Sequence, residues 1–482
     1  MKRKGQILVT IMIMGLIAIL FITGLASWAA ASRRAVQRAI LGEEAFHIAE
    51  AGLEYYRWHL AHEREDYQDG HDWCCSQPPC EWCGPYEHNY YDKNNQVVGQ
   101  FVLKIKPPAI GTSIVTIQST GRTAESALIK RTVESKLAIA SLAKYAVAAN
   151  DKMRFGQGTE VFGPIHSNDG IRFDGLAHNI VTSAKTTYDD PDHDPGTEEW
   201  TVHTHINPID PLPPTTLPSR PDVFTTGRQV SVSAIDFDGI SGDLAQIKTN
   251  AQANGHYFPP SGYLGYNLLL KTNNTFDLYR VTSLRPRPSS SCNSSQDGWG
   301  TWSVQNQTFL NNYPMPNNGL IFLEDNLWVE GQIDSARLTI VSGRFPENPS
   351  TDTSITINND LLYSDYNGKD VIGLIAQKNI NVGLYSQDNL QIDAALVAKN
   401  GRVGRYYYNQ YCGQSRFRNQ ITLNGMIATS QRYGFSYVCS GVYCSGYQER
   451  ILNYDANLLY GPPPSFPLTS DRYTILSWRE VK

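Results

Sequence analysis

Residues 2–31, KRKGQILVTIMIMGLIAILFITGLASWAAA, contain the strongest structural signal in the chain. Three basic residues precede Gly5, and residues 6–31 contain no charged side chain. At about 1.5 Å of rise per residue, a helix over this run crosses the roughly 30 Å hydrocarbon core of a bilayer. The basic flank predicts an N-terminus on the cytoplasmic side. We therefore expect a single-pass anchor in the cytoplasmic membrane, with the rest of the chain outside the cytoplasm.

A cleaved secretory signal is the alternative, because Ala29–Ala31 resembles a cleavage site. The apolar run is longer than a signal core, however, and small and apolar residues continue beyond it at steps of three and four without a proline. The members of this seam are Ala35, Ala39, Gly42, Phe46, Ala49, Leu53, Tyr56 and Leu60. The spacing predicts one helix from about residue 6 to residue 62. Its seam must lie against the protein's own sheet or against neighbouring subunits.

The N-terminal sequence resembles that of type IV pilins and pseudopilins, through KRKG at 2–5, the uncharged run, and GEEAFHIAEAGLE at 42–54. The last phrase is most similar to PilX-type minor pilins, which are related to GspK-type pseudopilins. The resemblance implies cleavage between Gly5 and Gln6 by a prepilin peptidase and assembly with other pilin subunits. It also implies that a set of helix residues packs in a filament, namely Thr10, Phe46, Ala49, Glu50 and Leu53.

Two positions depart from the family pattern. Gln6 stands where mature chains usually begin with Phe or Met, and Thr10 stands where they usually carry Glu. In the family, that Glu is thought to pair with the N-terminal amine of an adjoining subunit, and a buried carboxylate without a partner is costly. A subunit at the tip has no subunit above it, so Thr10 favours a tip or initiating position. The alternative is a tolerated polar residue in a membrane helix.

Composition and motifs exclude several function classes. The 482 residues include 41 basic and 46 acidic ones, and a net charge of −5 disfavours a globally basic nucleic-acid binder. The sequence contains no nucleophile-elbow, Walker A or HExxH motif, and no carboxylate pair that it ties together in space. We therefore expect no enzymatic activity, and no cofactor other than the Ca²⁺ considered below.

Eight cysteines follow the membrane segment, and an even number there predicts disulfides in an oxidising compartment. Proximity favours a bond between Cys439 and Cys444, and pairing within the 74–83 cluster, but sequence does not fix the connectivity. The cysteines expected in these bonds are Cys74, Cys75, Cys80, Cys83, Cys439 and Cys444. A zinc site is the alternative, because Cys80-x-x-Cys83 has the spacing of a ligand pair.

We expect an α+β fold in which a long helix and a short antiparallel sheet precede a mainly β head. Three strand-like runs, over 97–105, 113–119 and 127–136, predict the antiparallel sheet, and in the first of them Phe101, Leu103 and Ile105 alternate with Val102 and Lys104. The predicted divisions are 1–31 for the leader and membrane helix, 32–95 for the continued amphipathic helix and Cys-rich loop, 96–140 for the pilin-like strands, 141–460 for the head and 461–482 for a Pro-rich tail.

The head contains a weak internal repeat. Short apolar runs followed by small or polar turns recur at 161–168, 371–378, 394–400 and 424–430. Such recurrence predicts the stacked coils of a β-solenoid, and a twisted β-sandwich is the alternative. One helix is expected within the head, at about 242–254.

Three groups of side chains are candidate sites in the head. Asp189, Asp190, Asp192 and Asp194 supply hard oxygen ligands that suit Ca²⁺, although Pro191 and Pro195 also suit a solvated loop. His203 and His205 share a face if they lie on a strand, but two ligands do not make a zinc site.

The third group combines cations with aromatic rings, which can together hold single-stranded DNA or a glycan. A structural corner with packed tyrosines and solvated arginines is the alternative. Its members are Arg402, Arg405, Tyr406, Tyr407, Arg416 and Arg418.

These observations predict a minor pilin-like subunit of a type IV pilus or a related filament. We expect it at the tip, in assembly priming, adhesion to a surface glycan, or DNA capture. The alternatives are a type II secretion pseudopilin, a membrane-tethered carbohydrate-active enzyme with a β-solenoid head, and an anchored surface protein that does not polymerise.

Overall fold

The computed structural model describes residues 4–74, 81–108, 112–193, 196–439, 442–459, 461–468 and 472–481. The chain divides into two compact units. The first, which we call the stem, comprises Met1–Pro108, Ile114–Ala138 and Asp471–Lys482. The second, which we call the head, comprises Ala109–Ser113 and Ile139–Ser470. The head is therefore an insertion into the stem sequence.

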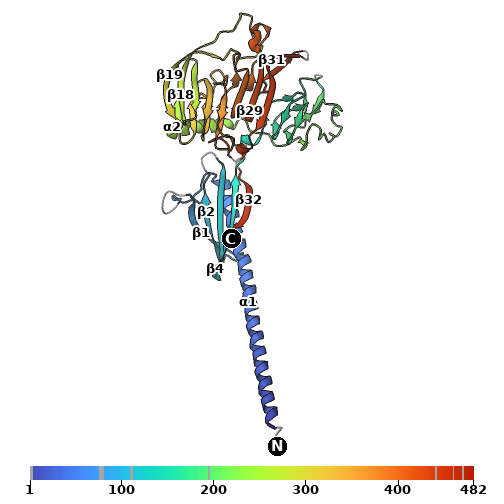
Figure 1. Cartoon of the computed structure of the whole chain (residues 1–482), viewed down its shortest axis with the longest axis vertical. Helices are drawn as coiled ribbons and strands as arrows, with labels where there is room; N and C mark the ends of the chain where they lie inside the picture. Colours follow the sequence, from blue (N-terminus) through green and yellow to red (C-terminus); the bar gives the residue numbers. More distant parts are fainter. Residues whose placement is uncertain are drawn as a thin grey trace. The chain divides into compact units, whose positions relative to one another are not determined.

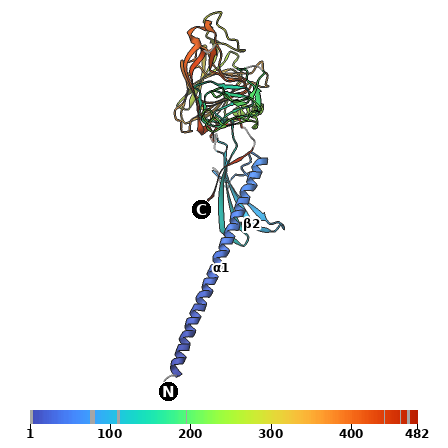
Figure 2. The ribbon, with the colours of Figure 1, turned by 90° about the vertical axis from the view of Figure 1, so that its right-hand side faces the viewer.

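A single helix, α1 (Lys4–His62), opens the stem and is visible as the long blue rod of Figures 1 and 2. No proline interrupts its 59 residues. Residues 7–40 are exposed along their whole length, whereas buried positions begin at Leu41 and continue to Leu60. The seam is therefore covered by the protein's own sheet only over its second half.

The stem sheet has five antiparallel strands in the order β1-β2-β3-β4-β32. The strands are β1 (Cys83–Tyr91), β2 (Val97–Lys106), β3 (Ile114–Thr123), β4 (Ser126–Ala138) and β32 (Thr474–Val481). In β3, buried and half-buried residues alternate strictly, as expected of a strand with one covered face. The three expected strands correspond to β2, β3 and β4.

Two glycines allow the helix and the sheet to approach closely. A Cβ atom on Gly121, in the central strand β3, would lie 2.0 Å from the backbone oxygen of Ala45 in α1. A Cβ atom on Gly52 would lie 2.3 Å from the Oγ of Ser119. The buried face of α1 therefore packs against the backbone of β3, and larger residues at these positions would separate the two layers.

The strands of the head pair mainly in parallel ladders. The longest ladder contains, in spatial order, β16 (His256–Phe258), β20 (Leu320–Leu323), β22 (Arg337–Ser342), β25 (Val371–Ala376), β27 (Asn389–Ala398), β29 (Phe417–Thr429), β5 (Val147–Ala149), β8 (Ile165–Ser167), β11 (Val181–Ser183) and β15 (Arg228–Gln229). Every residue of β25 is buried, which is typical of parallel strands that are covered on both faces. The apolar runs at 371–378, 394–400 and 424–430 lie on adjacent strands of this ladder.

Further ladders run beside it. One contains β17 (Gly265–Lys271), β21 (Leu327–Ile333), β23 (Ile355–Thr356), β26 (Ile380–Val382) and β28 (Val403–Arg405). Another passes from β21 through β24 (Leu361–Tyr363), β27, β29 and β31 (Val442–Tyr454) to β7 (Glu160–Val161) and β10 (Leu176–Ala177). A short one contains β6 (Met153–Phe155), β9 (Ile171–Phe173) and β14 (Val202–His203).

Antiparallel pairs interrupt this pattern at three places. They are β17 with β18 (Thr275–Leu284) and β19 (Val304–Pro314), β30 (Ser436–Cys439) with β31, and β12 (Thr187–Asp189) with β13 (Glu198–Trp200).

The order of strands in the longest ladder is not the order of the chain. The chain enters the head at β5, passes outward to β15, and then crosses to the opposite end of the ladder at β16. It returns through β29, which pairs with β5 through residues 147–149 and 427–429. Figure 1 shows the two runs on either side of this junction, with β18 and β19 far along one of them. The two runs of the ladder are therefore joined by contacts between residues about 280 positions apart in the sequence.

The crossing segment contains the helix α2 (Ile240–Asn254), which begins two residues before the expected position. Its apolar face, with Leu244 and Ile247, packs against strand residues such as Val341 and Ile375. Phe466 joins the same core. The segment expected as one tail over 461–482 is thus divided, because residues around Phe466 belong to the head and β32 belongs to the stem sheet.

Three disulfides join described cysteines: Cys74–Cys83, Cys292–Cys412 and Cys439–Cys444. The bond at Cys83 removes that sulfur as a zinc ligand. Cys75 and Cys80 lie outside the described residues. The sequence did not pair Cys292 with Cys412, because 120 residues separate them and only the fold brings them together.

Candidate functional sites

The first candidate site is the exposed apolar surface of α1. Leu20 and Trp28 are 68% and 70% exposed, and a window of this helix reaches a mean hydropathy of 2.7 with none of it buried. Among the described residues, α1 is one helix that is long and apolar enough to cross a membrane. Such a surface is stable only when lipid or another protein covers it.

Beyond the uncharged run, the exposed part of α1 changes character. Arg33, Arg34 and Arg38 follow the apolar segment, while Val36 and Ile40 remain 58% and 54% exposed. This stretch is amphipathic, and within the described structure no residue of the stem sheet covers its apolar side. It can therefore contact another apolar surface outside the bilayer.

The residues implicated in filament packing have different environments in the structure. Ala49 and Leu53 are buried against the stem sheet, at 0% and 7% exposure, so they pack within the chain. Phe46 is half-buried and contacts the Trp478 ring edge-on at a centroid distance of 5.9 Å. Glu50 is half-buried beside it, whereas Thr10 lies on the exposed half of the helix.

The cleavage position implied by the family resemblance lies in the first turn of α1, between Gly5 and Gln6. The side chain of Gln6 falls outside the described part of the chain. Cleavage there stays a prediction.

The second candidate site is the group of arginines and tyrosines at 402–418, which does not form one surface. Arg405 is completely buried, and its guanidinium donates hydrogen bonds to the carbonyls of Leu384 and Ser415 at 3.1 and 2.8 Å, and to that of Gly383. Burial lowers the pKa of Arg405 from its usual value. Tyr406 is also buried, at 1% exposure. These two residues belong to the core of the head and cannot contact a ligand.

The other members of this group are half-buried and held by neighbours. Arg402 donates to the hydroxyl of Tyr437 at 2.9 Å, and Arg418 donates to the carbonyl of Leu384 at 2.8 Å. Arg416 lies over the ring of Phe417, 4.4 Å from its centroid. Tyr407 contacts Tyr437 edge-on. The arrangement corresponds to a packed structural corner more closely than to a continuous binding patch.

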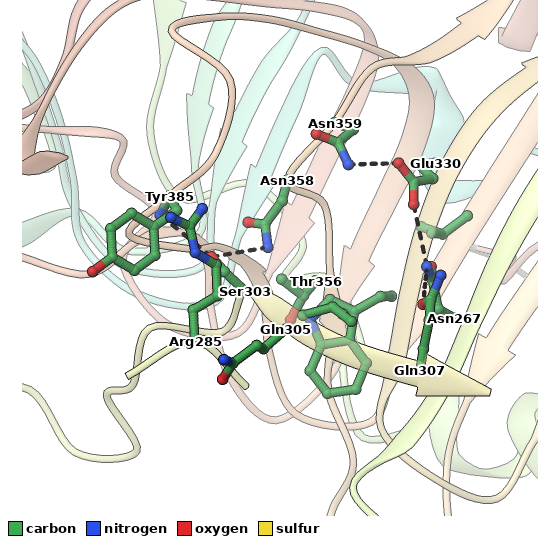
Figure 3. Close-up of a pocket in the computed structure, with 13 residues that line it drawn as sticks. Asn267, Arg285, Ser303, Gln305, Gln307, Glu330, Thr356, Asn358, Asn359 and Tyr385 are labelled. Atoms are coloured by element: carbon green, nitrogen blue, oxygen red, sulfur yellow. Dashed lines mark hydrogen bonds between the residues drawn. The ribbon is translucent and has the colours of Figure 1, made fainter. Parts of the chain in front are cut away.

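The third candidate site is a polar cleft of about 320 Å³ beside the ladder of β17 and β21, which the sequence did not indicate (Figure 3). Amide side chains dominate its wall. At one end Glu330 accepts hydrogen bonds from Asn267 at 3.2 Å and from Asn359 at 2.5 Å. At the other end the Arg285 guanidinium stacks over the ring of Tyr385, 4.1 Å from its centroid.

The chemistry of this cleft favours binding of a neutral polar molecule. Asn and Gln side chains offer both hydrogen-bond donors and hydrogen-bond acceptors. Glu330 is the only carboxylate among the residues that line the cleft. Glycoside hydrolysis ordinarily requires two carboxyl groups across the scissile bond, so these residues do not supply that mechanism.

The fourth candidate site concerns the aspartates at 189–194. Asp189 is exposed and accepts from the backbone of Gly196, and Asp192 forms ion pairs with Arg432 at 2.7 Å and Arg154 at 3.6 Å. Asp190 alone turns inward. Asp194 lies outside the described residues. The described aspartates therefore do not converge as Ca²⁺ ligands would.

Asp190 instead joins a buried group with His203, His205 and Glu199. Sequence reasoning considered both histidines but found no third ligand. The sequence does contain an indication of this third ligand. Glu199, His203 and His205 are separated by even numbers of residues, so an extended segment would place all three on one face.

Together, the fold and these surfaces define a class of protein: one helix suited to a membrane anchor, joined to a mostly β-structured remainder. No family model and no curated protein matches the chain. Among solved structures, it is similar to the crystal structure of the competence-associated pilin ComZ from Thermus thermophilus. The two are 13% identical, the alignment covers 92% of this chain and 98% of that one, and the TM-score is 0.29. At that identity and score, the similarity does not assign the chain to a family.

Proposed function

We propose that this protein is a minor pilin-like subunit of a type IV pilus or a related filament. The observation that carries the proposal is the division of α1 into an exposed half, residues 7–40, and a half packed on a five-stranded antiparallel sheet. Lipid can cover the uncharged part of the exposed half before assembly. The amphipathic stretch around Val36 and Ile40 lies beyond a bilayer of about 30 Å and would be covered by neighbouring subunits.

The position we propose is the filament tip. The head comprises residues 139–470, inserted between β4 and β32. An insertion of this size is difficult to repeat along a tightly packed fibre, and Thr10 removes the carboxylate that would pair with an adjoining subunit. A low copy number at one end satisfies both conditions.

We propose that the parallel ladders of the head close into a β-solenoid that presents the cleft lined by Glu330 and Tyr385 to a surface glycan. Its amide-rich wall and single carboxylate support adhesion more than hydrolysis. DNA capture has less support, since Arg405 and Tyr406 are buried. Assembly priming and service in a type II secretion system are compatible with the same stem.

Processing tests the class of the protein. The full chain would be expressed with a prepilin peptidase, and the mature N-terminus would be determined by intact mass. We expect a chain that begins at Gln6, and no cleavage of a Gly5→Val variant. A chain that begins at Ser32 would instead indicate a secreted head, and an uncut chain would indicate a tethered surface protein.

Position in the filament requires a second experiment. Filaments sheared from cells that express a tagged chain would be labelled with gold-conjugated antibody. Label at one end only is expected. Label along the whole fibre would contradict the tip position but keep the class, whereas label confined to membranes would exclude filament assembly.

A further inference from the structure

Four side chains with metal-binding atoms converge in the arm of the head that runs from β5 to β15. Asp190 directly follows β12, Glu199 lies in β13, His203 ends β14, and His205 follows it by two residues. One ligand atom from each lies within 4.8 Å of all the others. Within the described part of the chain, no other group of three or more such residues meets this condition.

The separations between these atoms suit direct ligation of one ion. His203 Nε2 lies 3.3 Å from Glu199 Oε2 and 3.7 Å from Asp190 Oδ2, and His205 Nε2 lies 2.9 Å from Glu199 Oε1. Ligands at about 2.0–2.1 Å from a tetrahedral ion are separated from one another by about 3.3 Å. Small adjustments of the side chains would therefore complete a tetrahedral shell.

The second observation is that several of these atoms are buried and have no hydrogen-bond partner. They are Asp190 Oδ2, Glu199 Oε2 and His203 Nε2. Their residues are only 2%, 4% and 2% exposed. An unsatisfied buried polar atom costs about 1–3 kcal/mol, and more when it is charged. Three such atoms that face one another form a site whose polar groups a bound cation would satisfy.

The orientation of His203 supports a metal ligand in particular. Its Nδ1 lies 2.9 Å from the carbonyl oxygen of Trp200, so Nδ1 carries the hydrogen in that bond. In the neutral ring, Nε2 then presents a lone pair to the two carboxylates. Metal-bound histidines characteristically donate their other N–H to a backbone carbonyl in this way.

The surrounding charges are compatible with a divalent cation. The two carboxylates would balance it. Arg172, which lies 3.5 Å from Asp190 Oδ2, is also paired with Asp174 at 2.8 Å. His193 Nδ1 lies 3.2 Å from Glu199 Oε1 and can orient that carboxylate.

We propose that Asp190, Glu199, His203 and His205 bind one divalent transition-metal ion, with zinc as the expected occupant. Two imidazoles with two carboxylates are a donor set for zinc rather than for calcium, which prefers oxygen ligands alone. Four protein ligands fill a tetrahedral shell, so the site is structural. The ion would fasten the β12–β13 hairpin to β14 and stabilise this arm of the head.

The test uses the full-length chain in detergent, stripped of metal and titrated with Zn²⁺ and with Co²⁺. We expect one ion per chain by elemental analysis, and visible absorption bands of tetrahedral cobalt. His203→Gln should weaken binding by at least about 100-fold, a loss that even outer-shell substitutions can approach. The matched control is His178→Gln, because His178 also pairs with a glutamate, Glu160, at 3.1 Å but lies outside the group.

Each outcome decides the question. If His203→Gln does not fold, the cobalt spectrum of the unaltered chain and the isosteric Glu199→Gln variant give the answer. A stripped chain that binds neither ion would overturn the proposal. Equal binding by the His203→Gln and His178→Gln variants would also overturn it.

Discussion

Replacement of Gly121 by alanine tests how closely α1 packs on the stem sheet. The added Cβ would lie 2.0 Å from the oxygen of Ala45 and 2.5 Å from the nitrogen of Ala49, both in the backbone of α1. Ordinary van der Waals contact begins near 3.4 Å. Because these are backbone atoms, no side chain can rotate away to make room. The 2.0 Å contact must lengthen to about 3.4 Å, so the helix or β3 must move by more than 1 Å.

The expected cost follows from this displacement. Overpacking of a dense core typically costs about 1–3 kcal/mol, and a clash with backbone on one side and a central strand on the other places this variant at the upper end. A loss of about 3 kcal/mol in a unit of roughly 150 residues lowers its melting temperature by about 10 °C.

Hydrogen exchange of the full chain in detergent would measure this loss locally. We expect faster exchange in peptides from β3 and from residues 41–60, with the head unchanged. The matched control is Gly42→Ala in α1, whose Cβ would meet only Arg131 Nη1 at 3.7 Å. That variant should stabilise the helix by about 1 kcal/mol. Unchanged protection in the Gly121→Ala stem would refute the close packing that we describe.

Three further predictions concern buried polar groups and a cross-link. Thermal unfolding should show that Arg405→Ala destabilises the head by about 3–5 kcal/mol, since several buried carbonyls lose their hydrogen-bond donor. The control is Arg432→Ala, which removes a partly exposed ion pair and should cost less than about 1 kcal/mol. Burial alone would raise the pKa of Asp66. The backbone N–H groups of Gln68 and Gly70 and the imidazole of His59 outweigh that effect and hold the pKa of Asp66 below its usual value. Because the pKa of Asp66 is lower in the folded state, the ionised carboxylate stabilises the stem at neutral pH, and this stabilisation is lost as pH falls below about 4. An Asp66→Asn variant whose stem shows the same acid dependence of unfolding would contradict this. The Cys292–Cys412 bond closes a loop of 120 residues, so its removal should lower the stability of the head by about 4 kcal/mol in denaturant titrations. A loss below about 1 kcal/mol would count against this prediction.

The long helix could be predicted from sequence because its determinants are local. An uncharged run, a seam at steps of three and four, and the absence of proline act over neighbouring residues only, and the helix at Lys4–His62 has nearly the predicted bounds. Strands β2, β3 and β4 were predictable for the same reason, since each is a strand-like run of neighbouring residues, and burial alternates strictly in β3 although not in β4. The edge strand β1 was not, because its polar, aromatic sequence is set by an exposed edge position rather than by burial.

The candidate sites show where local reasoning ends. The alternation of Arg402, Arg405 and tyrosines resembled a binding surface, but which side of a corner faces the solvent depends on the strands that cover it. Glu199 and the two histidines shared a period of two, yet Asp190 joined them only because β12 pairs with β13 and the end of β12 thereby lies close to Glu199.

Local sequence was enough to predict a membrane-length helix, a small antiparallel sheet and a β-rich remainder, because hydrophobic period and chain stiffness act over a few residues. Long-range packing, in contrast, adds β32 to the stem sheet, pairs β5 with β29, and brings Asp190, Glu199, His203 and His205 together. These contacts join residues up to about 350 positions apart. Their formation depends on which surfaces remain uncovered once the local elements exist, and no short stretch of sequence records that.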